Sequence, residues 1–117
     1  AAIGMASKLK NGEVVGLTGD QLLREGIMVP FFGIDTPTPQ AAAVMALKWS
    51  VPIYMVRVER FKGIKFKLSV EDKLKFPKHL DKDKATYEIT RLISKRIEEW
   101  ILDKPEQWLW AHRRWGK

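Results

Sequence analysis

The 117-residue sequence predicts a single α/β domain, built from a small mixed sheet flanked by helices. Hydrophobic residues make up 45% of the chain and charged residues 30%, which is a globular composition. Short apolar runs with β character alternate with longer stretches whose apolar residues recur at helical spacing. A chain of this length can bury one hydrophobic core, so residues 1–117 are expected to form one domain.

The first part of the chain is expected to contain one helix and two strands. Residues 1–10 are rich in helix formers, and Asn11 with the glycine after it provides a stop. Residues 13–18 form a short apolar run that predicts a buried strand. The run Ile27–Phe32 predicts a second strand, and Pro30 places it at a sheet edge or at a strand end.

The middle of the chain is expected to form a helix followed by a hairpin. Thr38 is a suitable N-cap and Pro39 a suitable first residue for a helix that reaches about Trp49. Val51–Glu59 predicts a third strand. Ile64–Val70 alternates apolar and polar residues, which is typical of a half-exposed strand that pairs with the third in a hairpin.

The last long element is predicted to be a helix from about Asp83 to Asp103. Its polar side chains include Glu88 and Arg91, which are close enough along a helix to pair. Pro105 either ends this helix or starts a new short one. The apolar face of the helix is defined by residues at helical spacing, namely Ala85, Ile89, Leu92, Ile93, Ile97, Trp100 and Ile101.

The charge of the chain is concentrated in its second half. Residues 1–56 hold four basic and four acidic side chains, whereas residues 57–117 hold 17 basic and 10 acidic ones. The net charge of +7 therefore arises from the second half. Such a surface attracts the phosphates of nucleic acid or anionic lipid, or an acidic carrier protein. A solvated lysine-rich face without any partner explains the same charge.

Several common catalytic and metal-binding patterns are absent from the sequence. It has no cysteine, which excludes disulfides, thiolate nucleophiles and Cys-ligated zinc, and its two histidines disfavour a multi-histidine metal site. It has neither a glycine-rich phosphate loop nor a G-x-S-x-G turn. We therefore expect no metal and no other cofactor. The apolar runs are much shorter than the roughly 20 residues that span a bilayer.

Two further features are candidates for a functional site. Asp20 follows the first expected strand, where α/β proteins place functional carboxylates, although a plain turn residue is the simpler explanation. Three of the five tryptophans lie within residues 108–115, beside His112 and two arginines. Tryptophan next to arginine is typical of an interfacial anchor or a phosphate-binding edge. The alternative is that the tryptophans pack on the core and leave the arginines in solvent.

Taken in order, these motifs resemble a known family. The chain carries D-Q at position 20, GIMVPFFG, a Thr-capped helix, VPIYMVRVER and finally PEQWLWAHRRW. Together they are similar to the C-terminal part of the bacterial lipid A biosynthesis acyltransferases, the lauroyl and myristoyl transferases of the lysophospholipid acyltransferase superfamily. The most specific motifs are VPFFG at Val29–Gly33 and W-x-H-R-R-W at Trp110–Trp115.

The resemblance implies an activity and a location. Members of the family move a fatty acyl chain from acyl carrier protein to a hydroxyl of a lipid A precursor in lipopolysaccharide biosynthesis, at the cytoplasmic face of the bacterial inner membrane. A histidine in an H-x4-D/E motif acts as general base and a carboxylate orients it. That motif is absent here, because His79 is followed five positions later by Lys84 and His112 by Lys117. We therefore expect a C-terminal fragment that has no catalytic residue of its own and is inactive alone.

The resemblance also implies a set of substrate-binding residues. The D-Q pair matches the rim of the site, and the VPFFG block matches the lining of the acyl or acceptor groove. An arginine at position 60 suits a glycolipid phosphate. The closing motif fixes the fold, faces lipid headgroups or helps to bind the phosphorylated substrate. The complete set is Asp20, Gln21, Val29, Pro30, Phe31, Phe32, Gly33, Thr38, Arg57, Arg60, His112, Arg113 and Arg114.

The partners that the resemblance implies are acyl carrier protein, the lipid A precursor, an anionic membrane surface and the missing N-terminal part of the enzyme. The alternative is a non-catalytic basic α/β module that binds anionic lipid or nucleic acid. Nucleic acid is disfavoured because the aromatic residues cluster in one tail, and because neither an RNA-recognition signature nor a helix-turn-helix is visible.

Overall fold

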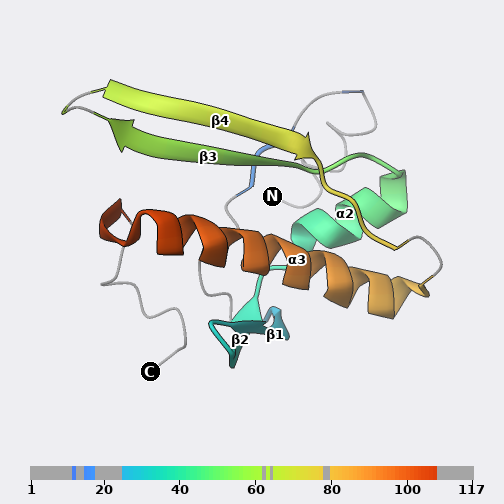
Figure 1. The fold of residues 1–117 in the computed structure, drawn as a ribbon. Helices are drawn as coiled ribbons and strands as arrows, with labels where there is room; N and C mark the ends of the chain where they lie inside the picture. The colour runs from blue at the N-terminus through green and yellow to red at the C-terminus, as the bar shows by residue number, and fades with distance from the viewer. Residues whose placement is uncertain are drawn as a thin grey trace.

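The computed structural model describes residues 12, 15–17, 25–61, 63, 65–77 and 80–107. Helix α3 runs through the middle of this part, with one β-hairpin on each side of it (Figure 1). The α/β class that the sequence predicts is confirmed. In chain order the elements are β1 (Ile27–Phe31), β2 (Ile34–Thr38), α2 (Ala41–Trp49), β3 (Tyr54–Phe61), β4 (Lys65–Lys73), α3 (Lys82–Asp103) and the 3-10 turn η1 (Pro105–Gln107).

The described strands form two separate antiparallel hairpins, β1–β2 and β3–β4. In β1–β2, Ile27 pairs with Thr38 and Phe31 pairs with Ile34. This close pairing requires a glycine at position 26, because a Cβ there would lie 2.1 Å from the carbonyl oxygen of Thr38. Each strand of a two-stranded ribbon keeps one free edge, so a proline such as Pro30 is tolerated in it.

Strand β2 and the start of α2 differ from the sequence prediction. Thr38 does not cap a helix: it is the last residue of β2, and its buried hydroxyl donates to the carbonyl oxygen of Thr36 at 3.0 Å. Helix α2 begins at Ala41 after Gln40, which makes no side-chain capping hydrogen bond. A Thr-Pro pair suits a strand end as well as a helix start, and pairing with β1 decides between them.

Two predicted elements lie near the N-terminus. Residues 15–17 have no regular secondary structure, so the strand predicted over 13–18 is wrong at these positions. An apolar run becomes a strand only when another strand pairs with it. The helix predicted over residues 1–10 lies outside the described residues.

The β3–β4 hairpin confirms the second pair of predicted strands. Val56 lies opposite Val70 and Val58 lies opposite Leu68, so apolar residues of both strands share one face. The sequence predicts a half-exposed strand, and the apolar side is the exposed one: Phe66, Leu68 and Val70 keep 62–68% of their surface in solvent. The opposite face is directed at α3, which it contacts through the side chains described below.

Helix α3 confirms the prediction for residues 83–103, with its first residue at Lys82. Its N-cap is Asp81, whose carboxylate accepts a hydrogen bond from the amide of Lys84 at 2.9 Å. No helix in the described part of the chain is long and apolar enough to cross a membrane. The buried residues of α3 include three polar ones that the hydrophobic pattern does not reveal, Thr86, Thr90 and Ser94.

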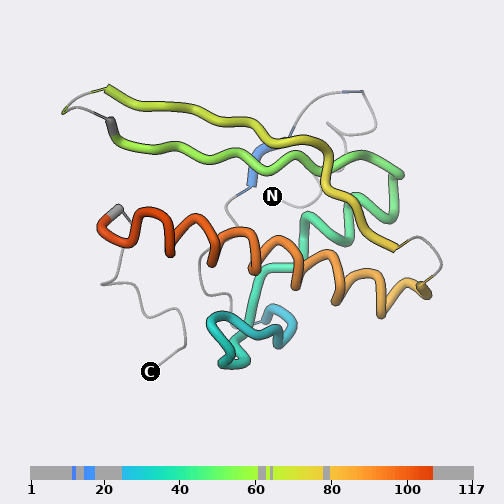
Figure 2. Tube along the Cα trace, in the orientation of Figure 1, coloured from blue at the N-terminus to red at the C-terminus, as the bar shows by residue number. Residues whose placement is uncertain are grey.

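The hydrophobic core joins segments that are far apart in the sequence. Phe31 of β1, Met55 of β3 and Ile97 and Ile101 of α3 form one buried cluster. Half-buried Phe32, Ile93 and Trp100 pack against it. Figure 2 shows the same relationship in the backbone trace: the β1–β2 hairpin lies against the middle of α3, although more than 40 residues separate them.

Candidate functional site

The VPFFG motif forms the turn of the β1–β2 hairpin. Phe32 and Gly33 both have positive φ, at 52° and 79°, which is the geometry of a two-residue type I′ turn. Gly33 adopts it freely, but an aromatic residue in the left-handed region is strained by about 1–3 kcal/mol. The surrounding contacts must therefore hold Phe32 in place.

Two contacts hold the Phe32 turn against the rest of the structure. The backbone amide of Phe32 donates to the Oε1 atom of Glu98, a carboxylate on α3. The ring of Phe32 meets that of Phe31 edge to face, with centroids 4.9 Å apart. Phe31 itself is 1% exposed and belongs to the core cluster. The ring of Phe31 and the carboxylate of Glu98 together hold the turn in place.

A small open pocket of about 200 Å³ lies between this turn and α3. Pro30 and Gly33 line it from the hairpin, and Arg91, Lys95 and Glu98 line it from the helix. Three of its five lining residues are charged, and its volume is small compared with that of typical ligand pockets, which begin at roughly 300 Å³. The pocket is therefore suited to a compact polar group and not to a long hydrocarbon chain.

Of the two cations that line this pocket, Arg91 is paired with a carboxylate, whereas Lys95 has no ion pair among the described residues. The Nε atom of Arg91 donates to Glu88 at 3.1 Å, and this hydrogen bond lowers the pKa of Glu88 and raises the pKa of Arg91. Glu98 accepts from the Phe32 amide. Within the described ranges, Lys95 forms no ion pair and is exposed. Among the described residues that line the pocket, Lys95 is therefore the cation that could pair with an anion there.

Arg57, which the resemblance assigns to substrate binding, is held in a network at the end of α3. Its Nη2 atom lies 2.8 Å from the Asp103 carboxylate and 3.4 Å from the carbonyl oxygen of Trp100. Its Nε atom lies 3.4 Å from Glu59, and its guanidinium lies over the Trp100 ring at 6.0 Å from the centroid. These contacts connect β3 to α3.

A second network connects β4 to α3. The Nε atom of Arg96 donates to both oxygens of Glu71, at 2.7 and 2.9 Å, and the indole nitrogen of Trp100 donates to the same carboxylate at 3.4 Å. The hydrogen bond from Arg96 holds the pKa of Glu71 below its ordinary value. This network and the one at Arg57 share Trp100, so the hairpin is anchored at two points along the helix.

The structure brings some of the sequence-predicted site residues together and separates others. Val29–Gly33 and Thr38 lie in one hairpin, where Val29 and Thr38 are fully buried and only Pro30 and Gly33 line the pocket. Arg57 and Arg60 lie on β3, in the hairpin on the other side of α3 (Figure 1). The remaining predicted residues lie outside the described ranges, namely Asp20, Gln21, His112, Arg113 and Arg114.

Sequence reasoning missed the residues that α3 contributes to the pocket. The sequence places Arg91 and Lys95 on the polar face of the predicted helix and does not single out Glu98. The only available signal is their spacing, because residues three or four positions apart lie on one face of a helix. Only the folded structure shows that the VPFFG turn packs beside them. No cluster of side chains that could hold a metal ion occurs within the described residues.

The fold and the pocket define an α/β protein in which a strained aromatic turn and a charged helix border a small, open polar pocket. The family model for the bacterial lipid A biosynthesis acyltransferases matches residues 3–117, nearly the whole chain. The chain therefore belongs to this family. As a member of this family, the chain is associated with acyl transfer and with lipid A and lipopolysaccharide biosynthesis. None of the curated proteins compared with the chain matches it.

Proposed function

We propose that this chain is the C-terminal portion of an enzyme that transfers a fatty acyl chain from acyl carrier protein to a hydroxyl of a lipid A precursor. The enzyme acts at the cytoplasmic face of the bacterial inner membrane. Family membership supports the reaction class. Within that reaction we assign this chain to substrate binding, and we assign the pocket beside the VPFFG turn to a phosphate of the precursor.

The observation that carries the phosphate assignment is Lys95 beside the turn, which is exposed and has no ion pair with the residues that the structure describes. Lys95 and Arg91 lie one helical turn apart and line the same pocket as Gly33. A phosphate is compact enough for about 200 Å³, and Lys95 can pair with it directly, whereas the charge of Arg91 is shared with Glu88. The carboxylate of Glu98 opposes an anion, but its hydrogen bond to the Phe32 amide offsets part of its charge.

Turnover requires chemistry that the 117 residues do not contain. The H-x4-D/E pair is absent from the sequence. A neutral imidazole is needed to take the proton of the acceptor hydroxyl as the oxygen attacks the acyl thioester, and a carboxylate is needed to orient the imidazole. The carbon–sulfur bond then breaks, and the imidazolium returns the proton to the leaving thiolate of the acyl carrier. We assign that pair to polypeptide outside these residues, so the chain alone binds the precursor without acylating it.

The test compares binding with turnover. The chain is titrated with the phosphorylated lipid A precursor and with the same disaccharide after phosphatase treatment, and tryptophan fluorescence is followed. We expect the phosphorylated form to bind more tightly, by at least about tenfold, and Lys95→Gln to remove most of that preference. Lys73→Gln, an exposed lysine on β4, is the matched control and should leave it unchanged.

Two results would contradict the proposal. Equal affinity for both forms of the precursor would exclude the phosphate assignment, and no binding of either form would exclude the substrate-binding role. Incubation of the chain with acyl carrier protein and precursor should yield no acylated product. A product formed by the chain alone would show that its own residues carry catalysis.

A further inference from the structure

The backbone amide of Phe32, at the tip of the β1–β2 hairpin, has an anion as its hydrogen-bond acceptor. It donates to the carboxylate of Glu98 on α3, whereas the usual acceptor of a backbone amide is a carbonyl oxygen. Amides that project from a turn bind anions because their N–H dipoles are directed outward, and such hydrogen bonds are strengthened by the charge. The contact with Glu98 therefore shows that this position of the turn accepts an anion.

The pocket beside the turn gives a further anion access to the same place. Half-buried Glu98 lines it together with Lys95, which is exposed. On the hairpin side the lining includes Gly33, where an added Cβ would meet nothing within 4 Å. A glycine lets a ligand approach the backbone closely, so the turn is accessible from the pocket.

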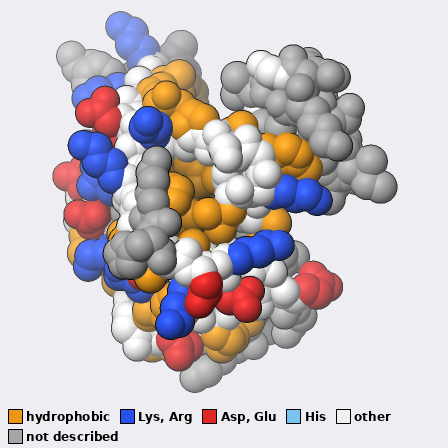
Figure 3. All heavy atoms as spheres, turned by 90° about the vertical axis from the view of Figure 1, so that its right-hand side faces the viewer, with side chains coloured by type: hydrophobic (Ala, Val, Ile, Leu, Met, Phe, Trp, Pro, Cys, Tyr) orange, Lys and Arg blue, Asp and Glu red, His pale blue; other side chains and the backbone are white. Residues whose placement is uncertain are grey.

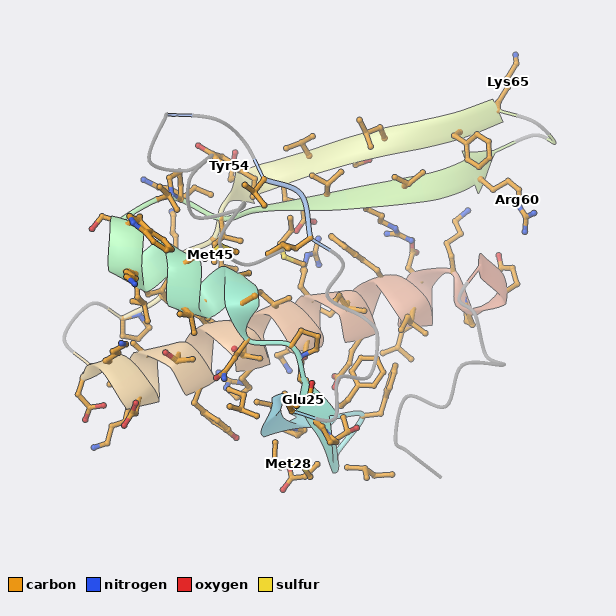
Figure 4. The ribbon with its side chains drawn as sticks, turned by 180° about the vertical axis from the view of Figure 1, so that it is seen from behind. Glu25, Met28, Met45, Tyr54, Arg60 and Lys65 are labelled. Atoms are coloured by element: carbon orange, nitrogen blue, oxygen red, sulfur yellow. The ribbon has the colours of Figure 1, made fainter. Side chains whose placement is uncertain are left out.

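Charge alone does not distinguish this pocket from the rest of the surface. On the face drawn in Figure 3, basic and acidic side chains are interspersed along one flank. Figure 4 shows Arg60 and Lys65 at the tip of the β3–β4 hairpin, whereas Met28 lies in the β1–β2 hairpin on the other side of α3. What marks the pocket is the combination of a turn amide that holds an anion with a lysine that has no ion pair among the described residues.

We propose that the Phe32 amide is a binding group for a phosphate monoester, and that Glu98 is the internal anion that this phosphate displaces. In the exchange the amide transfers its hydrogen bond from the carboxylate to a phosphate oxygen, and Lys95 supplies the opposite charge. Glu98 then turns toward water, which its half-buried position on α3 permits. The inference rests on the proposed function because it concerns the same phosphate. It adds a binding group in the turn and a competitor on the helix.

The exchange makes Glu98 a determinant of specificity. A carboxylate that occupies the amide lowers the apparent affinity for every anion, according to the fraction of molecules in which the amide is held. An anion displaces Glu98 only if it gains more from the amide and Lys95 than the carboxylate loses. A phosphate monoester has roughly two negative charges and three acceptor oxygens, so it can bond both groups at once. Chloride has one charge and should not displace Glu98.

Two roles of Glu98 predict opposite effects of its neutralisation. If Glu98 only holds the turn, neutralising it loosens the phosphate site and weakens binding. If Glu98 also competes for the Phe32 amide, neutralising it strengthens binding even though the turn becomes less stable. Glu98→Gln distinguishes the two roles, because its side-chain oxygen still accepts a hydrogen bond while the negative charge is removed.

The experiment follows the phenylalanine amides of the isotopically labelled chain by NMR during a titration with inorganic phosphate. Sodium chloride keeps the ionic strength constant, and Phe32→Tyr identifies the Phe32 signal by removing it. We expect phosphate to shift the Phe32 signal saturably and to leave that of Phe66, on the other hairpin, in place. Glu98→Gln should bind phosphate at least about fivefold more tightly than the unmodified chain.

Matched controls separate the exchange from the general effect of charge. Glu99→Gln removes the same charge one position further along α3, from a side chain that is 54% exposed, and it should leave the phosphate affinity unchanged. Lys95→Gln should weaken phosphate binding by at least about fivefold, whereas Lys65→Gln, on the other side of α3, should not. Circular dichroism checks that every variant is folded.

Three results would overturn the exchange. The first is a Glu98→Gln chain that binds phosphate no more tightly than the unmodified chain. The second is saturable phosphate binding that leaves the Phe32 signal in place. The third is the absence of saturable binding in both proteins.

The exchange and the proposed function can fail separately. If the chain prefers the phosphorylated precursor but phosphate never moves the Phe32 signal, the exchange is wrong and the proposed function stands. If inorganic phosphate moves the Phe32 signal but both forms of the precursor bind equally, the precursor assignment is wrong and the exchange stands.

Discussion

The backbone amide of Phe32 donates a hydrogen bond to the carboxylate of Glu98, 66 positions later in the chain. This bond joins the most specific motif of the sequence to the helix that completes the pocket. It also compensates for the left-handed backbone of Phe32, whose φ is 52°. The shape of the candidate site therefore depends on a contact between two segments that are far apart in the sequence.

Replacing Glu98 should loosen the VPFFG turn. Glu98→Ala leaves the Phe32 amide without its carboxylate partner, and loss of a charge-assisted hydrogen bond costs about 1.5–3 kcal/mol. Glu98→Gln keeps an acceptor and should cost less. Urea unfolding measures both, and Glu99→Ala, an exposed neighbour, is the control. Equal stability of Glu98→Ala and Glu99→Ala would show that the bond is not formed in solution.

Gly26→Ala should destabilise the β1–β2 hairpin. The added Cβ would lie 2.1 Å from the carbonyl oxygen of Thr38, a backbone atom that cannot move without breaking the strand pairing. We expect a loss of about 2 kcal/mol or more in the free energy of unfolding. Gly16→Ala is the control, because nothing lies within 4 Å of the equivalent position. A Gly26→Ala protein as stable as Gly16→Ala would contradict the observed register.

Ser94→Ala should leave stability unchanged or raise it. Ser94 is 1% exposed, and its hydroxyl has no hydrogen-bond partner in the described structure. A buried hydroxyl without a partner loses its hydration on folding, so removing it should gain up to about 1 kcal/mol. Thr90→Val is the comparison and should destabilise, because the Thr90 hydroxyl donates to the carbonyl oxygen of Thr86 at 2.8 Å. A clear loss on Ser94→Ala would reveal a partner in the folded protein.

The Glu71–Arg96 pair should make stability depend on acid pH. Arg96 lowers the pKa of Glu71 in the folded state. The stabilisation by the ion pair is therefore fully present above the pKa of Glu71 in the unfolded chain, about 4.3. It is lost as the pH falls through the lower pKa that Glu71 has in the folded protein. The two side chains are 27% and 39% exposed, so Glu71→Gln should cost no more than about 1 kcal/mol at pH 7.

The measurement is a series of urea unfolding curves between neutral pH and about pH 3. Glu71→Gln should lose less stability than the unmodified chain on acidification below about pH 4.3, because it has no carboxylate to protonate. Asp72→Asn, an exposed neighbour on β4, should follow the unmodified chain. Parallel curves for Glu71→Gln and the unmodified chain would mean that the pair contributes nothing.

The local elements were predictable where a pattern is strong. The helical spacing of apolar residues from Ala85 to Ile101 locates α3, and the alternation in residues 64–70 locates β4. The Glu88–Arg91 pair follows from the same spacing. Strand β2 was missed because Asp35 to Thr38 has no β pattern of its own: it is a strand only because the Phe32-Gly33 turn folds it back on β1.

The sequence by itself determined the family, the α/β class, the basic second half and the absence of the H-x4-D/E pair, because each depends on residue identity or on spacing within one segment. Only the tertiary structure decided that Glu98 holds the VPFFG turn, that Lys95 lines its pocket and that the apolar side of β3–β4 faces outward. These features arise from contacts between distant segments. Burial of Met55 in the core, together with the ion pairs of Arg57 and Glu71 with α3, holds one face of the hairpin against the helix and leaves the apolar face in solvent.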